Sequence, residues 1–415
     1  MVFMSSNKNK RQMADVDEQL EVLFHGADFG DRATQKNMEK ELRVMLEQDR
    51  PLKVYAGFDP TSVDLHLGHT LPMRKLRQFQ DFGHIVTFLI GNFTGLVGDP
   101  SDKDKTRPML SADELAENAK TYTGQAFKIL DSKSTIIKYN ADWLSKLSFS
   151  DVVSLCSKFT VAQFLERDNF AKRWQAHNPV YLSEFMYAIM QAYDAVALKT
   201  DIQIGGSDQL FNLMAGRTLQ KDAGLNPQVV ITLPILVGTD GHERMSKSTG
   251  NSIGINDSPE DMFGKVMSIP DSAIMQYFTL LTALTPSEVS KIEKDLNEGS
   301  LLKMDAKKEL ALQIVKIFHG EKNANNAQEF FEATIQRNEI PKNILELVIA
   351  EPDSLSKILL KSSLVQSGGE VRRLTSQGAI TVNGNVIDDF MTLINDKDEI
   401  RVGRHRFLRI RIDQQ

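Results

Sequence analysis

The sequence has little cysteine and no long apolar run. Its 415 residues include one cysteine, Cys156, which excludes a disulfide framework and a cysteine-rich zinc or iron–sulfur site. No run of 18 apolar residues occurs, and no apolar segment of signal-peptide length follows the N-terminus. A membrane-spanning helix is therefore not expected, and the sequence predicts a cytoplasmic protein.

Positive charge is also scarce overall, since the formal net charge is −6. This balance argues against a general nucleic-acid coat protein. The charge is uneven, however: residues 401–411 contain five arginines and no acid, and residues 352–415 carry a net +2. A basic end on an acidic body suggests contact with a polyanion. Arginines that keep an edge strand from pairing would explain the same pattern equally well.

Residues 53–255 alternate strand-like and helix-like segments. The expected strands are 53–58, 84–93, 134–139, 201–206 and 229–234, and the expected helices are 65–83, 111–131 and 183–198. Strands that alternate with helices predict an α/β fold with a Rossmann-like parallel sheet covered on both faces. Such sheets bind ligands at the carboxyl ends of the strands, where the strand order reverses.

Beyond residue 255 the alternation of strand-like and helix-like segments ends. Residues 258–349 show helical periodicity only, which predicts an all-α domain, and Pro352 marks the next break. Beyond it we expect a small α+β domain with helices at 355–364 and 371–378, strands at 379–382, 399–402 and 407–412, and a hairpin turn at Asn383-Gly384. The predicted division is an N-terminal extension at 1–30, an α/β domain at 31–255, a helical domain at 256–350 and a small α+β domain at 351–415.

Two histidines, His66 and His69, stand three residues apart at the start of a predicted helix. This spacing places them on one helical face. Gly68 between them removes a side chain, and a helix N-terminus attracts anions. With Thr61, the histidines could therefore surround the phosphates and ribose of a nucleotide. A zinc site is disfavoured because no third ligand stands at a useful spacing, and ordinary surface histidines remain an alternative.

The segment from Gly241 to Ser248 resembles a Walker-type phosphate loop but has Ser246 where that loop has glycine before its lysine. This difference excludes a P-loop NTPase. Arg244, Lys247 and the flanking serines instead suit a mobile cationic lid that closes on a pyrophosphate. Taken alone, the segment fits a disordered polar loop better than a lid.

Two glycine-rich segments follow predicted strands: Gly95-Leu-Val-Gly-Asp99 and Gly205-Gly-Ser-Asp-Gln209. Glycines there allow a ligand to approach the backbone, and the acid beyond can bind a ribose hydroxyl or an ammonium group. Tyr187, Gln191 and Asp194 share one face of an otherwise apolar helix. These polar groups need partners, either a structural network or a ligand with an amino group and a hydroxyl.

Together these segments resemble one enzyme family. His66-Leu-Gly-His69 and Arg244-Met-Ser-Lys-Ser248 are similar to the two signatures of class I aminoacyl-tRNA synthetases. Residues 55–61, 94–99, 187–194 and 203–209 resemble the bacterial-type tyrosyl branch of that family. The likeness runs from about residue 20 to the end, and residues 367–384 resemble a small RNA-binding domain shared with a ribosomal protein. The resemblance implies a catalytic domain at 31–255 that contains the dimer interface, an anticodon-recognition domain at 256–350 and an RNA-binding domain at 351–415. The lid signature departs from the family at Arg244, where lysine is usual.

The resemblance implies a tyrosine–tRNA ligase that uses ATP with Mg²⁺, L-tyrosine and the tyrosine tRNA as substrates, without a protein-ligated metal, and that forms a homodimer. The catalytic residues implied are Thr61, His66, His69, Arg244 and Lys247. The ATP-binding residues implied are Gly57, Asp59, Gly68, Gly206, Asp208, Met245, Ser246 and Ser248. The tyrosine-binding residues implied are Tyr55, Asp99, Tyr187, Gln191, Asp194 and Gln209. The RNA-binding residues implied are Arg372, Arg373, Arg401, Arg404 and Arg406.

Three other interpretations compete with this one. A short nucleotidyl transferase with the same histidine signature lacks the lid and the RNA-binding tail. A non-enzymatic RNA-binding relative would not need both nucleotide signatures. Both are intact here, which argues against that interpretation. A tryptophanyl relative fits less well, because Asp194 beside Tyr55 favours a phenol.

Overall fold

The chain is described by a computed structural model over residues 14–61, 63–99, 112–166, 168–337, 344–403 and 406–413. Its central sheet has five parallel strands in the order β3-β2-β1-β4-β5. The strands are β1 (Lys53–Phe58), β2 (Ile85–Ile90), β3 (Thr135–Tyr139), β4 (Ile202–Gly206) and β5 (Val229–Leu233). All five expected strands and the Rossmann-like order are confirmed.

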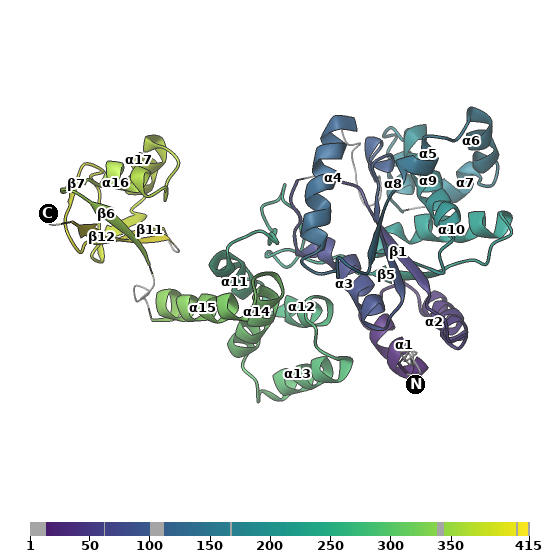
Figure 1. The fold of residues 1–415 in the computed structure, drawn as a ribbon, viewed down its shortest axis with the longest axis horizontal. Coiled ribbons are helices and arrows are strands. Elements are labelled where there is room, and N and C mark those ends of the chain that lie inside the picture. Colours follow the sequence, from purple (N-terminus) through teal and green to yellow (C-terminus); the bar gives the residue numbers. More distant parts are fainter. Residues whose placement is uncertain are drawn as a thin grey trace, which may run out of the picture.

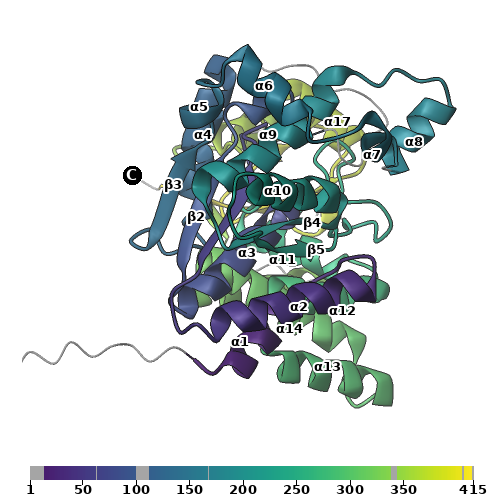
Figure 2. The ribbon, with the colours of Figure 1, turned by 90° about the vertical axis from the view of Figure 1, so that its right-hand side faces the viewer.

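Helices cover the sheet and extend beyond it (Figures 1 and 2). Before and around the sheet lie α1 (Val16–Phe24), α2 (Arg32–Leu46), α3 (Leu67–Asp81), α4 (Ala112–Ala126), α5 (Ala141–Leu144), α6 (Phe149–Cys156), α7 (Val161–Leu165), α8 (Asp168–Gln175), α9 (Leu182–Leu198) and α10 (Leu210–Asp222). After it come α11 (Pro259–Met267), α12 (Ile274–Leu281), α13 (Pro286–Glu298), α14 (Lys303–His319) and α15 (Glu321–Phe331). No helix in the described ranges is long and apolar enough to cross a membrane.

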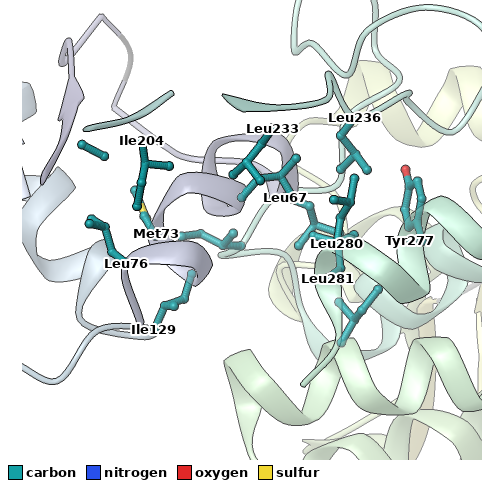
Figure 3. Packing of buried hydrophobic residues seen from close by; sticks show 14 of the residues in the cluster. Leu67, Met73, Leu76, Ile129, Ile204, Leu233, Leu236, Tyr277, Leu280 and Leu281 are labelled. Atoms are coloured by element: carbon teal, nitrogen blue, oxygen red, sulfur yellow. The ribbon is translucent and has the colours of Figure 1, made fainter. Parts of the chain in front are cut away.

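Helix α3 joins the sheet to the helical region. Figure 3 shows Met73 and Leu76 of α3 beside Ile204 of β4, and Leu67 of the same helix near Leu280 of α12. These side chains belong to one continuous buried cluster that runs from α1 to α15. Helix α1, which falls within the expected N-terminal extension, contributes buried Leu20 and Leu23. The predicted boundaries at 30 and 255 therefore cross a shared core.

The C-terminal unit has a core of its own. It contains α16 (Leu355–Lys361), α17 (Gly368–Ser376), and a mixed sheet in the order β6-β12-β11-β8-β9. The strands are β6 (Leu345–Ile349), β8 (Ile380–Val382), β9 (Asn385–Val386), β11 (Glu399–Val402) and β12 (Arg406–Ile412), with a second ribbon of β7 (Asp353–Ser354) and β10 (Leu393–Ile394). The hairpin turn is confirmed, since Asn383 and Gly384 both have positive φ between paired strands.

One expectation for this part of the chain is wrong. Residues 345–349 were expected to continue the helical region, but they form β6, which pairs in parallel with β12. Leu345, Leu347 and Ile349 alternate with Glu346 and Val348, a pattern that suits a strand once β12 supplies the pairing. The C-terminal unit therefore begins with β6, before Pro352.

Candidate active site

Two adjoining pockets lie at the carboxyl ends of β1 and β4, where the strand order reverses. The Tyr55 pocket includes Tyr55, Thr61, Asp99, Tyr187, Gln191 and Asp194 in its lining, and the His66 pocket includes His66, Gly68, Gly206 and Met245. Both pockets share Gly57, Phe58, Asp59, His69, Asp208, Gln209 and Arg244. The structure thus brings all but three of the residues predicted for the amino-acid and nucleotide sites into one cleft. The other three, Ser246, Lys247 and Ser248, continue the loop that follows Arg244 and Met245.

The floor of the Tyr55 pocket is buried and carries two polar groups. Tyr55 is 1% exposed and Asp194 is 3% exposed. Asp194 accepts hydrogen bonds from Trp143 Nε1 at 2.8 Å and Asn140 Nδ2 at 3.3 Å. Burial nevertheless raises the pKa of Asp194 to about 8. The Tyr55 hydroxyl has no hydrogen-bond partner among the described residues, so the floor presents a carboxyl group and an unsatisfied hydroxyl.

A chain of hydrogen bonds links this floor to the mouth of the pocket. Asn140 donates to Thr94 Oγ1 at 2.9 Å, and Thr94 donates to Asp59 Oδ1 at 2.7 Å. The Tyr187 hydroxyl donates to Asp59 Oδ2 at 2.9 Å. Asp59 was predicted for the nucleotide and Tyr187 for the amino acid, and the two are in direct contact. The network therefore spans both predicted subsites.

A second group of amides holds the opposite wall. Gln191 donates to Gln209 Oε1 at 3.2 Å and accepts from Asn212 Nδ2 at 2.9 Å. Because α9 carries Gln191 and the turn after β4 carries Gln209, this contact fixes the helix against the end of the strand. Asp99 lines the same pocket, beyond the end of β2. The wall is thus ordered by contacts between elements far apart in the sequence.

The two signature histidines form the N-terminal cap of α3. His66 is the N-cap residue, and its Nδ1 accepts from the Gly68 N–H at 3.2 Å, while His69 Nδ1 accepts from the His66 N–H at 3.2 Å. Burial, with Arg244 and Lys247 nearby, lowers the pKa of His66 to about 4. Because Nδ1 of each ring is an acceptor, the neutral rings carry their protons on Nε2. The Nε2–H of each ring is therefore its hydrogen-bond donor.

The lid loop, residues 241–250, is anchored by backbone and exposes its cations. Met245 is buried, and its N–H donates to Leu236 O at 2.8 Å. Arg244 Nη1 lies 3.6 Å from Asp208 Oδ2, and Lys247 Nζ lies 3.3 Å from Asp64 Oδ2. The side chains of Lys247 and Asp64 are 43% and 53% exposed. Each lid cation is therefore held against a carboxylate at the cleft.

Gly206 and Gly57 differ in the space that a side chain would have at each position. A Cβ at Gly206 would collide with Asp208 Oδ1, so a side chain there would displace the Asp208 carboxylate. A Cβ at Gly57 would meet nothing closer than Leu89 Cδ2 at 3.8 Å. The packing of the protein does not require glycine at Gly57, which leaves close approach of a ligand as the physical reason.

The predicted RNA-binding arginines divide into two kinds. Arg372 and Arg373 are exposed on α17. Arg401 stacks over Phe407, and Arg406 donates to Leu364 O and pairs with Glu370 at 3.3 Å. Arg404 lies outside the described residues. The arginines of α17 are therefore the more accessible cations of this group.

Residues 47–336 match the family description "tRNA synthetases class I (W and Y)". The chain belongs to this family. It is 46% identical to a tyrosine–tRNA ligase of Thermotoga maritima over 90% of this chain and 93% of that one. It is 44% identical to the corresponding enzyme of Carboxydothermus hydrogenoformans over 95% and 98% of the two chains. A C-terminally truncated mitochondrial tyrosyl-tRNA synthetase of Aspergillus nidulans shares the fold, with a TM-score of 0.59, 25% identity, and coverage of 77% and 93%.

The sequence prediction for this synthetase missed several residues of the cleft. Asn140 and Trp143 contact Asp194 but follow β3 without any recognisable motif. Gln203 is buried in the pocket lining and accepts from Gln228. Asp64, the partner of Lys247, stands two residues before His66. Two of these had a usable signal: Asp64 is an acid beside the histidine signature, and Gln203 opens the family-like segment 203–209.

Proposed function

We propose that this synthetase is a tyrosine–tRNA ligase. The carboxylate of L-tyrosine attacks the α-phosphorus of ATP, and the bond to the leaving pyrophosphate breaks to give tyrosyl-adenylate. The 3′-terminal adenosine of the tyrosine tRNA then takes the tyrosyl group and releases AMP. The observation that supports this proposal most directly is the buried pair of Tyr55 and Asp194 at the floor of a pocket that opens into the nucleotide signatures.

Selection of the amino acid rests on the buried end of the cleft. The phenol hydroxyl of tyrosine would donate to Asp194 and accept from the unsatisfied Tyr55 hydroxyl. Phenylalanine offers neither bond, so the buried Tyr55 hydroxyl would stay unsatisfied and Asp194 would keep only Trp143 and Asn140 as partners. Asp99, Tyr187 and Gln191 would receive the ammonium group, and Gln209 would lie near the carboxylate.

Activation by ATP rests on the other end. The substrate carboxylate is ionised at pH 7, so the step needs little general-base catalysis. Catalysis then depends on positioning the two substrates and on stabilising the charge that develops on the leaving pyrophosphate. His66 and His69 would donate through Nε2 to the nucleotide, and Thr61, Arg244 and Lys247 would stabilise the leaving pyrophosphate. Mg²⁺ enters with ATP as part of the substrate complex.

Gly57 and Asp208 would hold the nucleoside part of the same substrate. The open side of Gly57 lets the adenylate lie against β1. The Asp208 carboxylate would accept from the ribose hydroxyls, which requires Arg244 to leave it. The remaining predicted contacts come from Gly206 and the lid residues Met245, Ser246 and Ser248.

The C-terminal unit would bind the tRNA. Arg372 and Arg373 present exposed guanidinium groups from one helix, and phosphate contacts of this kind make affinity fall with salt. Replacing both by alanine should weaken tRNA binding and flatten its salt dependence, while adenylate formation continues unchanged. Filter binding at several salt concentrations measures this, and an unchanged salt slope would remove these two residues from the proposal.

A homodimer would form through the layer of short helices over the pocket. Large apolar side chains are exposed there, namely Phe149, Val153, Val161, Trp174, Tyr181 and Leu182. Several large exposed apolar side chains on neighbouring short helices are typical of an interface. Phe149→Glu should convert the dimer to a monomer in sedimentation or light-scattering measurements. A wild-type chain that is monomeric at micromolar concentration would contradict the dimer.

The decisive test of the activity is amino-acid-dependent ATP–pyrophosphate exchange with each of the twenty amino acids. We expect exchange with tyrosine and with no other. Exchange with a different amino acid would keep the family and overturn the assigned pocket. Failure with all twenty, from folded protein that still binds RNA, would favour a non-enzymatic relative.

A further inference from the structure

A third cavity lies between α1, the C-terminal half of α3 and the linker from α12 to α13. It shares no lining residue with the Tyr55 or His66 pockets. Its apolar lining includes Val22, Phe82, Leu284, Pro286 and Ile317. The cavity thus stands where the first helix and the helical region meet α3, outside the site assigned above.

The ionised residues of the lining are mostly cations. Arg74, Arg77 and Lys128 face one acid, Asp81, so the lining carries a formal net charge of +2. Asp81 is paired with Arg77 at 2.8 Å. Lys128 donates to Ile255 O at 3.0 Å and to the Asn256 side chain. No ion pair to Arg74 or Lys128 occurs among the described residues, so two of the three cations lack a carboxylate.

Arg74 is the central cation of the cavity lining. Its Nε donates to Leu280 O at 3.1 Å and its Nη2 donates to Thr282 O. Burial lowers the pKa of Arg74 to about 10, without any carboxylate to oppose the shift. The next residue, Lys75, donates to Val22 O at 3.2 Å and His25 O at 3.0 Å behind the wall. Burial, with Arg74 beside it, lowers the pKa of Lys75 to about 7, so Lys75 is only partly charged at neutral pH. Buried charges normally have a counter-charge, and Arg74, which stays charged, has only backbone carbonyls as partners.

The helix ends that accept these bonds do not cancel the charge. The C-termini of α1 and α12 each carry about half a negative charge, and Glu21 also acts on His25. The two helix ends and Glu21 together offset about two positive charges, and Asp81 offsets a third. Against them stand Arg74, Arg77, Lys128 and a Lys75 that is only partly charged at pH 7. A positive potential therefore remains at the cavity.

Two further polar atoms of the wall are unsatisfied. His25 Nε2 and Gln78 Oε1 are buried without a hydrogen-bond partner among the described residues. Burial and Lys75 lower the pKa of His25, so its ring is neutral at pH 7 and can donate one N–H. Gln78 follows Arg74 by one helical turn on α3, so the two side chains are neighbours. The wall therefore offers a cation, an N–H donor and an acceptor together.

We propose that this cavity binds a phosphate group that retains a proton, either as inorganic phosphate or as a monoester with an apolar substituent. The phosphate oxygens would accept from Arg74 and His25, and its P–OH would donate to Gln78 Oε1. Sulfate has the same shape and charge but no proton to donate at neutral pH. The acceptor on Gln78 therefore makes phosphate the better ligand. Phe82 and Leu284 would contact the substituent of an ester.

The test is isothermal titration of the full-length protein with sodium phosphate, sodium sulfate and phenyl phosphate at equal ionic strength. We expect phosphate to bind more tightly than sulfate. Tighter binding of phenyl phosphate than of inorganic phosphate would assign the site to monoesters, and the reverse order would assign it to the free ion. Equal binding of phosphate and sulfate would overturn the proposal.

A matched pair of variants places the binding in this cavity. Gln78→Glu puts a carboxylate one turn from Arg74, so it should raise Tm without phosphate and weaken phosphate binding by about tenfold or more. Gln48→Glu is the control, because Gln48 is exposed and already accepts a hydrogen bond from Arg50 at 3.0 Å. It should bind phosphate as the wild type does.

Undiminished phosphate binding by folded Gln78→Glu would overturn the proposal, because the binding would then lie elsewhere, for example at the lid cations. Should Gln78→Glu fail to fold, Gln78→Leu replaces it. This variant removes the acceptor without adding charge and should abolish the preference for phosphate over sulfate. A preference that survives in Gln78→Leu would equally refute the site.

Discussion

The two ends of the catalytic cleft hold their charged groups in opposite ways. At the Tyr55 pocket, Asp194 is buried, fixed by Trp143 and Asn140, and has a pKa of about 8. At the lid, Arg244 and Lys247 keep nearly half of their side-chain surface exposed and are paired with carboxylates. A buried group costs much if its partner is wrong, whereas exposed pairs exchange partners at little cost.

This difference matches the two tasks of the proposed enzyme. An amino-acid pocket must reject a substrate that lacks one hydroxyl, which requires a rigid site with unpaired buried groups. A lid must release its own carboxylates and take up a pyrophosphate whose charge develops during the reaction, which requires weak, exchangeable contacts. The following predictions test each end, from the largest expected effect to the smallest.

Removing a lid cation should affect the rate and not the binding of the amino acid. For Lys247→Ala we expect kcat of pyrophosphate exchange to fall by about 100-fold or more, because a preorganised charge at the leaving group is lost. The KM for tyrosine should stay near the wild-type value, and Lys247→Arg should retain more activity. A KM for tyrosine that rises as steeply as kcat falls would show that the two ends are not separate.

Changing the buried carboxyl should affect selectivity. For Asp194→Asn we expect the ratio of kcat/KM for tyrosine to that for phenylalanine to fall by about 10- to 100-fold, because a carboxyl group with two oxygens is replaced by an amide with one, which must already serve Trp143 and Asn140. Steady-state exchange with both amino acids measures this ratio. Asp142→Asn on the exposed side of α5 is the matched control. Equal selectivity in the two variants would contradict the role of Asp194.

The same carboxyl should make stability fall with pH. Its pKa is about 8 in the folded protein against 3.8 for an ordinary aspartate, so the folded state holds a proton that the unfolded state releases between pH 4 and 8. Stability contributed by this group is present below pH 4 and is lost as pH rises to about 8. The Tm of Asp194→Asn should therefore exceed that of the wild type by several degrees at pH 8.

This gain should become small near pH 4 and disappear at lower pH, where the wild-type carboxyl is protonated in both states. Thermal unfolding of both proteins at several pH values measures it, and Asp142→Asn should show no such trend. A constant difference in Tm between pH 4 and 8 would mean that Asp194 does not titrate as stated.

Freeing the lid from its surface carboxylate should have the smallest effect. Asp64→Asn removes an exposed ion pair with Lys247, worth at most about 1 kcal/mol. We expect the KM for ATP to decrease by less than about fivefold, since Lys247 no longer has to leave a partner. Kinetics at two salt concentrations check this, because the difference should shrink as salt rises. An increase in KM would show that Asp64 itself serves the nucleotide.

Much of this architecture was predictable because it depends on local pattern. The runs at 53–58 and 229–233 are apolar and bounded by turns, and they form β1 and β5. The spacing of His66 and His69 indicated a helix start, and both histidines cap α3. By contrast, Leu345–Ile349 became a strand only because β12 lies beside it. A short apolar segment fits a helix or a strand until its partner is known.

The sequence by itself determined the order of strands and helices, the positions of the glycines and cations, and the residues of the family signatures, because each depends on neighbours along the chain. Only the tertiary structure decided which groups meet. It brought Asn140 and Trp143 to Asp194, placed Tyr187 on Asp59, and packed α1 and α12 around Arg74 and Lys75. Burial and contact across the fold set the pKa of Asp194 and the unpaired hydroxyl of Tyr55, and no local pattern carries that information.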